Sequence, residues 1–147
     1  MDVLRMAYPP GDKRELRPKG SDSEKITINV GYVDLGHVDL LVQEGFYSNR
    51  SDFIRTAIRN QLGRHADAVA QSLTRRRADV GLRCFSRADL EEAARTGDRL
   101  HIQVLGLAVI ASDVPAELAC ATIASVEVLG ALQASPAVRA ALHDRIR

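Results

Sequence analysis

One short segment constrains this chain most, because it alternates like a β-strand and has no partner nearby in sequence. Residues 24–30 alternate between apolar and polar side chains. A lone strand leaves its backbone N–H and C=O groups unpaired, and even an isolated hairpin is marginal in water. We therefore expect the segment to pair with its copy in a second chain, as a two-stranded antiparallel ribbon. One face of such a ribbon is apolar and covered by helices, and the polar face fits the DNA major groove.

Two amphipathic helices are predicted to follow the strand. The first covers about residues 33–44, where apolar side chains recur at helical spacing. Gly45 is placed to end it in a left-handed conformation, and Ser48 is expected to be the N-cap of the second helix. The apolar stripe of the second helix extends past Gly63, which predicts a helical connector. That connector would end at Arg75–Arg77, which either complement the helix C-terminus or contact DNA.

Residues 78–147 carry a sequence repeat with a 24-residue period. Corresponding positions are Val80, Val104 and Val128; Leu90, Val114 and Val138; and Ala94, Leu118 and Leu142. Each copy is expected to form a short strand followed by a helix. The expected N-caps and first-turn prolines are Ser86 and Ser135, and Pro115 and Pro136. This pattern predicts a small solenoid-like domain of about three strand-helix repeats, with a compact α/β domain of pseudo-repeats as the alternative.

These segments predict an α+β chain in four parts. Residues 1–22 are polar and rich in Pro and Gly, so we expect a flexible arm. Residues 23–63 would form the strand-helix-helix domain and residues 64–77 the helical connector. Residues 78–147 would form the repeat-containing domain, used for oligomerisation or for sensing a signal.

Composition narrows the classes of function. The 20 basic and 19 acidic residues give a net charge of +1, so nucleic-acid binding would need a local patch. Cys84 and Cys120 lack metal-ligand spacing, the four histidines are dispersed, and no catalytic motif appears. We therefore expect no enzyme, metal or cofactor. Without a secretory signal, and with Val104–Ala111 as the longest apolar run, we expect a cytoplasmic protein with no membrane partner.

The stretch from Ile26 to Leu62 resembles the ribbon-helix-helix family of DNA-binding proteins, the MetJ/Arc or CopG-like type. Its most specific part is residues 45–55, in which Tyr-Ser-Asn-Arg-Ser precedes an acidic residue and a Phe-Ile pair. The predicted strand stands at the family's usual distance before this turn. Gly31 and Tyr32 depart from the family pattern, which commonly has Pro and then a polar residue there.

The resemblance implies a role for three groups of residues. The outward strand positions, which read base edges in the family, are Lys25, Thr27 and Asn29. Lys can donate to guanine, the Thr methyl can contact thymine, and Asn can pair with adenine. The phosphate clamp, at the N-terminus of the second helix, is Ser48, Asn49 and Arg50. The shared dimer core would be Ile26, Ile28, Val30, Leu35, Val38, Leu41, Phe53, Ile54 and Ile58.

We therefore predict a homodimeric bacterial transcription regulator, expected to be a repressor, that binds double-stranded DNA through its β-ribbon. The C-terminal domain would join dimers, with a tetramer through residues 78–147 as one option, or sense a signal. One alternative is the antitoxin of a toxin-antitoxin pair, which uses the same DNA-binding module. Another is a structural protein whose ribbon-helix-helix head only dimerises while its repeats stack end to end.

Overall fold

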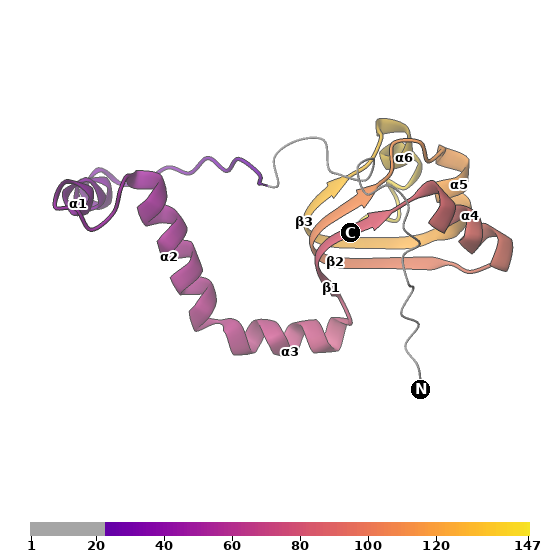
Figure 1. The fold of residues 1–147 in the computed structure, drawn as a ribbon, viewed down its shortest axis with the longest axis horizontal. Helices are drawn as coiled ribbons and strands as arrows, with labels where there is room; N and C mark the ends of the chain where they lie inside the picture. Colours follow the sequence, from indigo (N-terminus) through magenta and orange to yellow (C-terminus); the bar gives the residue numbers. More distant parts are fainter. Residues whose placement is uncertain (1–22) are drawn as a thin grey trace. The chain divides into compact units, whose positions relative to one another are not determined.

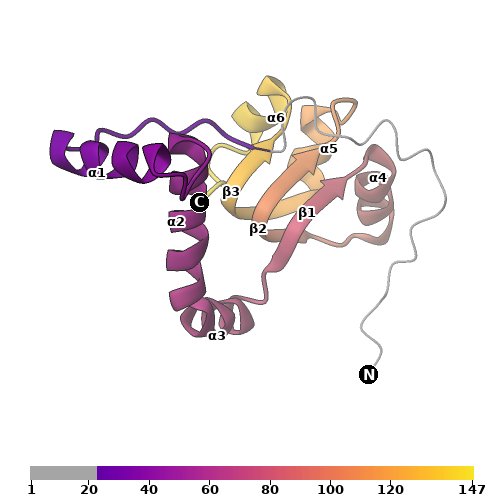
Figure 2. The same ribbon diagram turned by 60° about the vertical axis from the view of Figure 1, so that its left-hand side comes forward.

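A computed structural model describes residues 23–147, which form two compact units (Figure 1, Figure 2). The N-terminal unit is Lys25–Arg77, and the C-terminal unit is Ala78–Arg147 together with Ser23 and Glu24. The predicted flexible arm, residues 1–22, lies outside the described residues. The N-terminal unit contains helices, whereas strands and helices alternate in the C-terminal unit, so the chain is α+β as predicted.

The N-terminal unit has three helices, α1 (Tyr32–Gln43), α2 (Arg50–Arg64) and α3 (Ala66–Arg76). Gly45, with a φ of 85°, ends α1 in the left-handed conformation expected of it. The N–H groups of Gly45 and Phe46 donate to the carbonyls of Val42 and Leu41, at 3.1 and 3.0 Å. This Schellman motif satisfies carbonyls that the helix itself leaves unpaired.

A break at His65 separates α2 from α3, and α3 lies in the region where the helical connector was expected. His65 leaves the helical conformation with φ −103° and ψ 11°, and its N–H donates to the carbonyl of Leu62 at 3.1 Å. Gly63, two residues earlier, lowers the local helix propensity. α3 ends in the arginine cluster, where Arg77 adopts a left-handed conformation with φ 55°.

The predicted strand at residues 24–30 forms no β-ladder within one chain. Its apolar side chains are exposed, by 80% for Ile26, 62% for Ile28 and 42% for Val30. In this single chain the segment therefore lacks both a backbone partner and a cover for its apolar residues.

The C-terminal unit consists of three successive strand-helix pairs. They are β1 (Asp79–Phe85) with α4 (Arg87–Thr96), β2 (Leu100–Ile110) with α5 (Ala116–Thr122), and β3 (Ile123–Gln133) with α6 (Pro136–Ala141). The strands are parallel in the order β1-β2-β3, and the three helices lie on one side of the sheet (Figure 1). The core between them includes the fully buried side chains of Leu90, Ile123, Val126, Val138 and Leu142.

Strand register follows the predicted 24-residue spacing in only one of the two pairings. Val104 lies beside Val128, as predicted, but Val80 lies beside Leu105 and not beside Val104. The first strand is therefore displaced by one residue. A row of glycines fixes this alignment: Gly81, Gly106 and Gly130 are neighbours across the sheet, with φ of 105°, 136° and 127°. A Cβ atom at Gly106 or Gly130 would overlap the carbonyl oxygen of the preceding glycine in the row.

The positions that follow each strand of the repeat agree in burial at one set of residues and differ at another. Leu90, Val114 and Val138 are all buried, as their correspondence predicts. Ala94 is exposed, and Ala93 takes the buried position instead, because α4 presents that side to the sheet.

Three of the four expected helix-start residues have the predicted role. The side chains of Ser86 and Ser135 accept the N–H groups of the third helical residues, at 3.2 Å in both cases. Pro136 occupies the first turn of α6, as expected. Pro115 is the N-cap of α5 and not a first-turn residue, since its backbone is still extended with ψ 152°.

Candidate nucleic-acid interface

The N-terminus of α2 carries the residues assigned to the phosphate clamp. Asn49, and not the predicted Ser48, is the N-cap: its side-chain oxygen accepts the Asp52 N–H at 2.9 Å. The Asp52 carboxylate in turn accepts the Ser48 N–H at 3.0 Å. Tyr47 and Phe53 bracket the turn with an edge-to-face contact, their ring centroids 5.0 Å apart. The turn is therefore held rigidly while its first backbone N–H groups lie at the positive end of the helix.

Arg50, the charged member of the clamp, is paired with Asp39 of α1. Its Nε and Nη2 donate to the two carboxylate oxygens at 2.6 and 2.7 Å, and both side chains remain about half exposed. This hydrogen-bonded pair lowers the pKa of Asp39 and raises the pKa of Arg50. No sequence pattern indicated this contact, because Asp39 and Arg50 are eleven residues apart on different helices.

The residues assigned to base contacts are all exposed. Lys25, Thr27 and Asn29 lie on the unpaired segment that precedes α1. Of these three, only Lys25 carries a charge. In a single chain they are free to contact a ligand, but no strand pairing holds them in a fixed arrangement.

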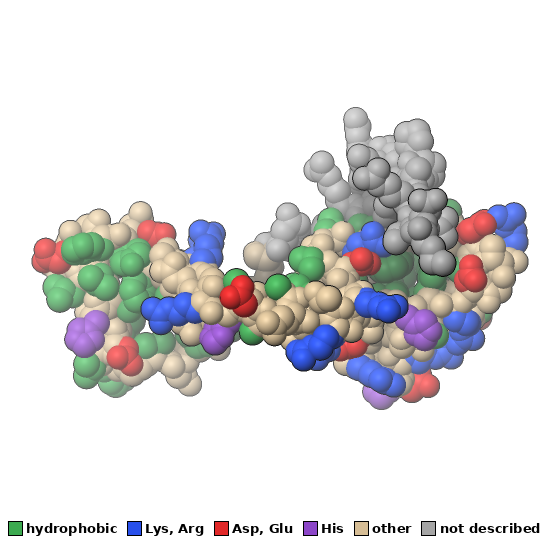
Figure 3. All heavy atoms as spheres, turned by 90° about the horizontal axis from the view of Figure 1, so that it is seen from below, with side chains coloured by type: hydrophobic (Ala, Val, Ile, Leu, Met, Phe, Trp, Pro, Cys, Tyr) green, Lys and Arg blue, Asp and Glu red, His purple; other side chains and the backbone are tan. Residues whose placement is uncertain are grey.

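An apolar groove of about 550 Å³ opens between the segment 24–30, α1 and α2. Every predicted dimer-core residue except Ile26 lines it, with Asp34, His37, Arg50, Ala57 and Gln61 as further lining residues. No residue of α1, α2 or α3 is buried. Hydrophobic side chains gather visibly on this unit (Figure 3). The N-terminal unit thus has the parts of a hydrophobic core without the second layer that would close it.

Residues 23–147 show no evidence of a metal site, a membrane-spanning helix or a disulfide. Within that range, no group of three or more His, Cys, Asp or Glu side chains could hold a metal ion. No helix there is long and apolar enough to cross a bilayer. Cys84 and Cys120 are thiols that form no disulfide, and burial raises the pKa of Cys84.

Comparison with known families agrees with this arrangement. The ribbon-helix-helix transcriptional regulator family matches residues 21–139, and the chain belongs to that family. The match includes the segment 24–30, α1 and α2, and it extends through most of the C-terminal unit. Membership implies a DNA-binding regulatory protein that dimerises, from a family that is generally not enzymatic. No curated protein and no solved structure gives a significant match.

Proposed function

We propose that the chain is a sequence-specific transcriptional repressor that acts as a homodimer. Two copies of the segment 24–30 would pair as an antiparallel ribbon, and two copies of α1 and α2 would close over its apolar face. The observation that carries this proposal is the open groove, in which the apolar residues of the segment and both helices already converge. A second copy would supply both the backbone partner and the missing layer.

In this arrangement the outward side chains of the ribbon would contact base edges in the major groove. Lys25, Thr27 and Asn29 supply the donor, methyl and amide groups that such readout uses. Each α2 N-terminus would hold a flanking phosphate through its backbone N–H groups and Arg50. Arg50 retains Nη1 for this purpose, since only its Nε and Nη2 donate to Asp39.

Fluorescence anisotropy with fragments of the upstream DNA of its own gene would test these roles. Lys25→Ala and Asn29→Ala should reduce the preference for one sequence over another. Arg50→Ala should weaken binding to all sequences and flatten the dependence of log K on log salt by about one unit. Arg95→Ala is a suitable control, because Arg95 lies on α4 and pairs with Glu92. A wild-type protein that prefers no sequence from its own genome would rule out the proposed function.

The C-terminal unit would join copies or sense a signal, with a tetramer as one possible assembly. We further propose that its three strand-helix pairs are copies of one repeat, a view that the alignment of Val104 with Val128 and of Gly106 with Gly130 supports. A cytoplasmic location fits this role. The folded core of residues 78–147 favours a regulator over an antitoxin, whose toxin-binding tail is often disordered when free.

A further inference from the structure

The sheet of the C-terminal unit has a face that α4, α5 and α6 do not cover. Successive side chains along a strand point to opposite sides, and Ile102, Val104 and Ala108 pack in the core under the helices. Alternate residues therefore point to the other face. Strand register places six of them in two rows, Val80, Leu105 and Leu129, and Leu82, Leu107 and Ala131. We call these six residues the open-face patch.

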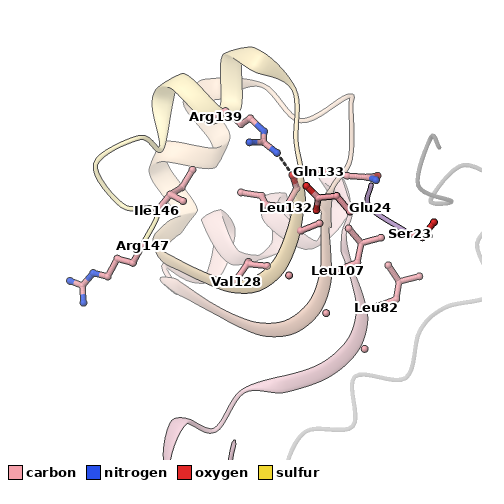
Figure 4. Close-up of a pocket in the computed structure, with 14 residues that line it drawn as sticks. Ser23, Glu24, Leu82, Leu107, Val128, Leu132, Gln133, Arg139, Ile146 and Arg147 are labelled. Atoms are coloured by element: carbon pink, nitrogen blue, oxygen red, sulfur yellow. Dashed lines mark hydrogen bonds between the residues drawn. The ribbon is translucent and has the colours of Figure 1, made fainter. Parts of the chain in front are cut away.

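The open-face patch is apolar and accessible. Val80, Leu82 and Leu129 are 64%, 54% and 50% exposed, and none of the six residues is charged. Leu82 and Leu107 line a pocket together with Ser23 and Glu24, and Arg139 and Ile146 also line it (Figure 4). Parallel sheets occur almost only with both faces covered. Within residues 23–147, no helix or strand covers the open-face patch, so the described chain lacks the cover that this type of sheet normally has there.

The size of the patch indicates what covers it. Three of the six side chains are at least half exposed and three are partly buried, and together they offer roughly 300–400 Å² of apolar surface. A stable interface between freely diffusing proteins needs about 800 Å² on each partner, so this patch alone would hold such a partner only weakly. A second copy is different, because the N-terminal unit already joins two chains. Tethering raises the effective concentration of the second patch to about millimolar, at which a small apolar contact forms.

We propose that the open-face patch packs against the same patch of a second copy, sheet against sheet. Sheets packed in this way lie about 10 Å apart with interdigitating side chains. Two-fold symmetry would place β2 against β2 of the other copy, with Leu105 and Leu107 at the centre of the contact. This proposal rests on the dimer of the proposed function and is independent of its DNA contacts.

The test is the assembly of the full-length chain with Leu82→Glu and Leu129→Glu together. Both residues are at least half exposed, so the charges should leave the fold of one chain intact. Sedimentation velocity from nanomolar to micromolar concentration would give mass and dissociation constant. The double variant should dissociate at a concentration roughly tenfold higher or more. If the patch joins two dimers instead, a four-chain wild type should become a two-chain variant.

Ala137→Glu with Ala140→Glu is the matched control, because it adds the same charges to exposed positions on α6, on the helix side. It should assemble like the wild type.

If circular dichroism shows that the two glutamates in the patch unfold the chain, Leu82→Ser with Leu129→Ser replaces that variant. Unchanged mass and dissociation constant in a folded patch variant would overturn the proposal and point to residues 1–22 or an unrelated partner as the cover. Loss of DNA binding by Arg50→Ala with unchanged assembly would bear only on the proposed function.

Discussion

At the scale of single residues, the contact with Asp39 determines how much positive charge Arg50 can offer to a DNA phosphate. The carboxylate occupies two donors of the guanidinium and neutralises it in part. We expect Asp39→Ala to tighten DNA binding about two- to fivefold, because an acidic group next to the phosphate site is removed. Asp67→Ala on α3 makes the same change in net charge and serves as the control. Weaker binding by Asp39→Ala would mean instead that Asp39 positions Arg50 for the phosphate.

The same pair predicts that the pKa of Asp39 differs between the wild type and a variant that lacks Arg50. The hydrogen bond from Arg50 lowers the pKa of Asp39 in the folded chain. A lowered folded-state pKa stabilises the fold above the unfolded-state pKa, and this contribution is lost as pH falls through the folded-state value. The pair should therefore be intact at neutral pH and break only in acid, below the ordinary pKa of an aspartate. In Arg50→Ala, the midpoint for Asp39 followed by NMR should rise, whereas Arg55→Ala should leave it unchanged.

Residue types in the sequence indicated candidates for the site, but they did not indicate the contacts between these residues. The turn from Tyr47 to Phe53 was recognisable from residue types, which identified Asn49 and Arg50 as functional candidates. Which side chain caps α2 depends on whether Ser48 or Asn49 adopts the extended backbone, and local composition allowed both. Asp39 lies eleven residues from Arg50 in sequence, so only the packing of α1 against α2 could reveal their contact.

At the scale of elements, the glycine row gives a sharp stability prediction. Gly106→Ala should destabilise the C-terminal unit by about 3 kcal/mol or more, because the new Cβ overlaps the Gly81 carbonyl at a φ that disfavours side chains. Gly36→Ala is the opposite case: it lies inside α1 with open space around it. It should stabilise α1 by about 0.5–1 kcal/mol. Urea unfolding monitored by circular dichroism would measure both, and a harmless Gly106→Ala would contradict the register that places Gly81 beside Gly106.

Element boundaries were predictable where a cap residue marks them. Gly45, Ser86 and Ser135 each end or begin a helix as their chemistry indicates. The break at His65 has no such marker, since apolar periodicity continues through it. The displaced first strand was also unpredictable, because a sequence repeat aligns residue types, whereas strand register depends on backbone fit at Gly81 and Gly106.

At the scale of the whole molecule, the uncovered groove predicts that association and DNA binding fail together. Ile28→Asp places a charge in the groove, and Ile28 is already 62% exposed in one chain, so the isolated chain should tolerate it. The variant should be monomeric at micromolar concentration and should not bind DNA. Val33→Asp, at an exposed position on α1 that does not line the groove, is the control. A dimeric Ile28→Asp would exclude the ribbon as the dimer contact.

The order of the strands has a consequence for how the chain reaches its native state. Each strand pairs in parallel with its neighbour in the chain across an intervening helix, so folding of the C-terminal unit should be one first-order phase limited by these non-local pairings. No residue of α1, α2 or α3 is fully buried in one chain, so their consolidation should wait for an encounter between two chains. Refolding should then show a second, slower phase whose rate rises in proportion to protein concentration.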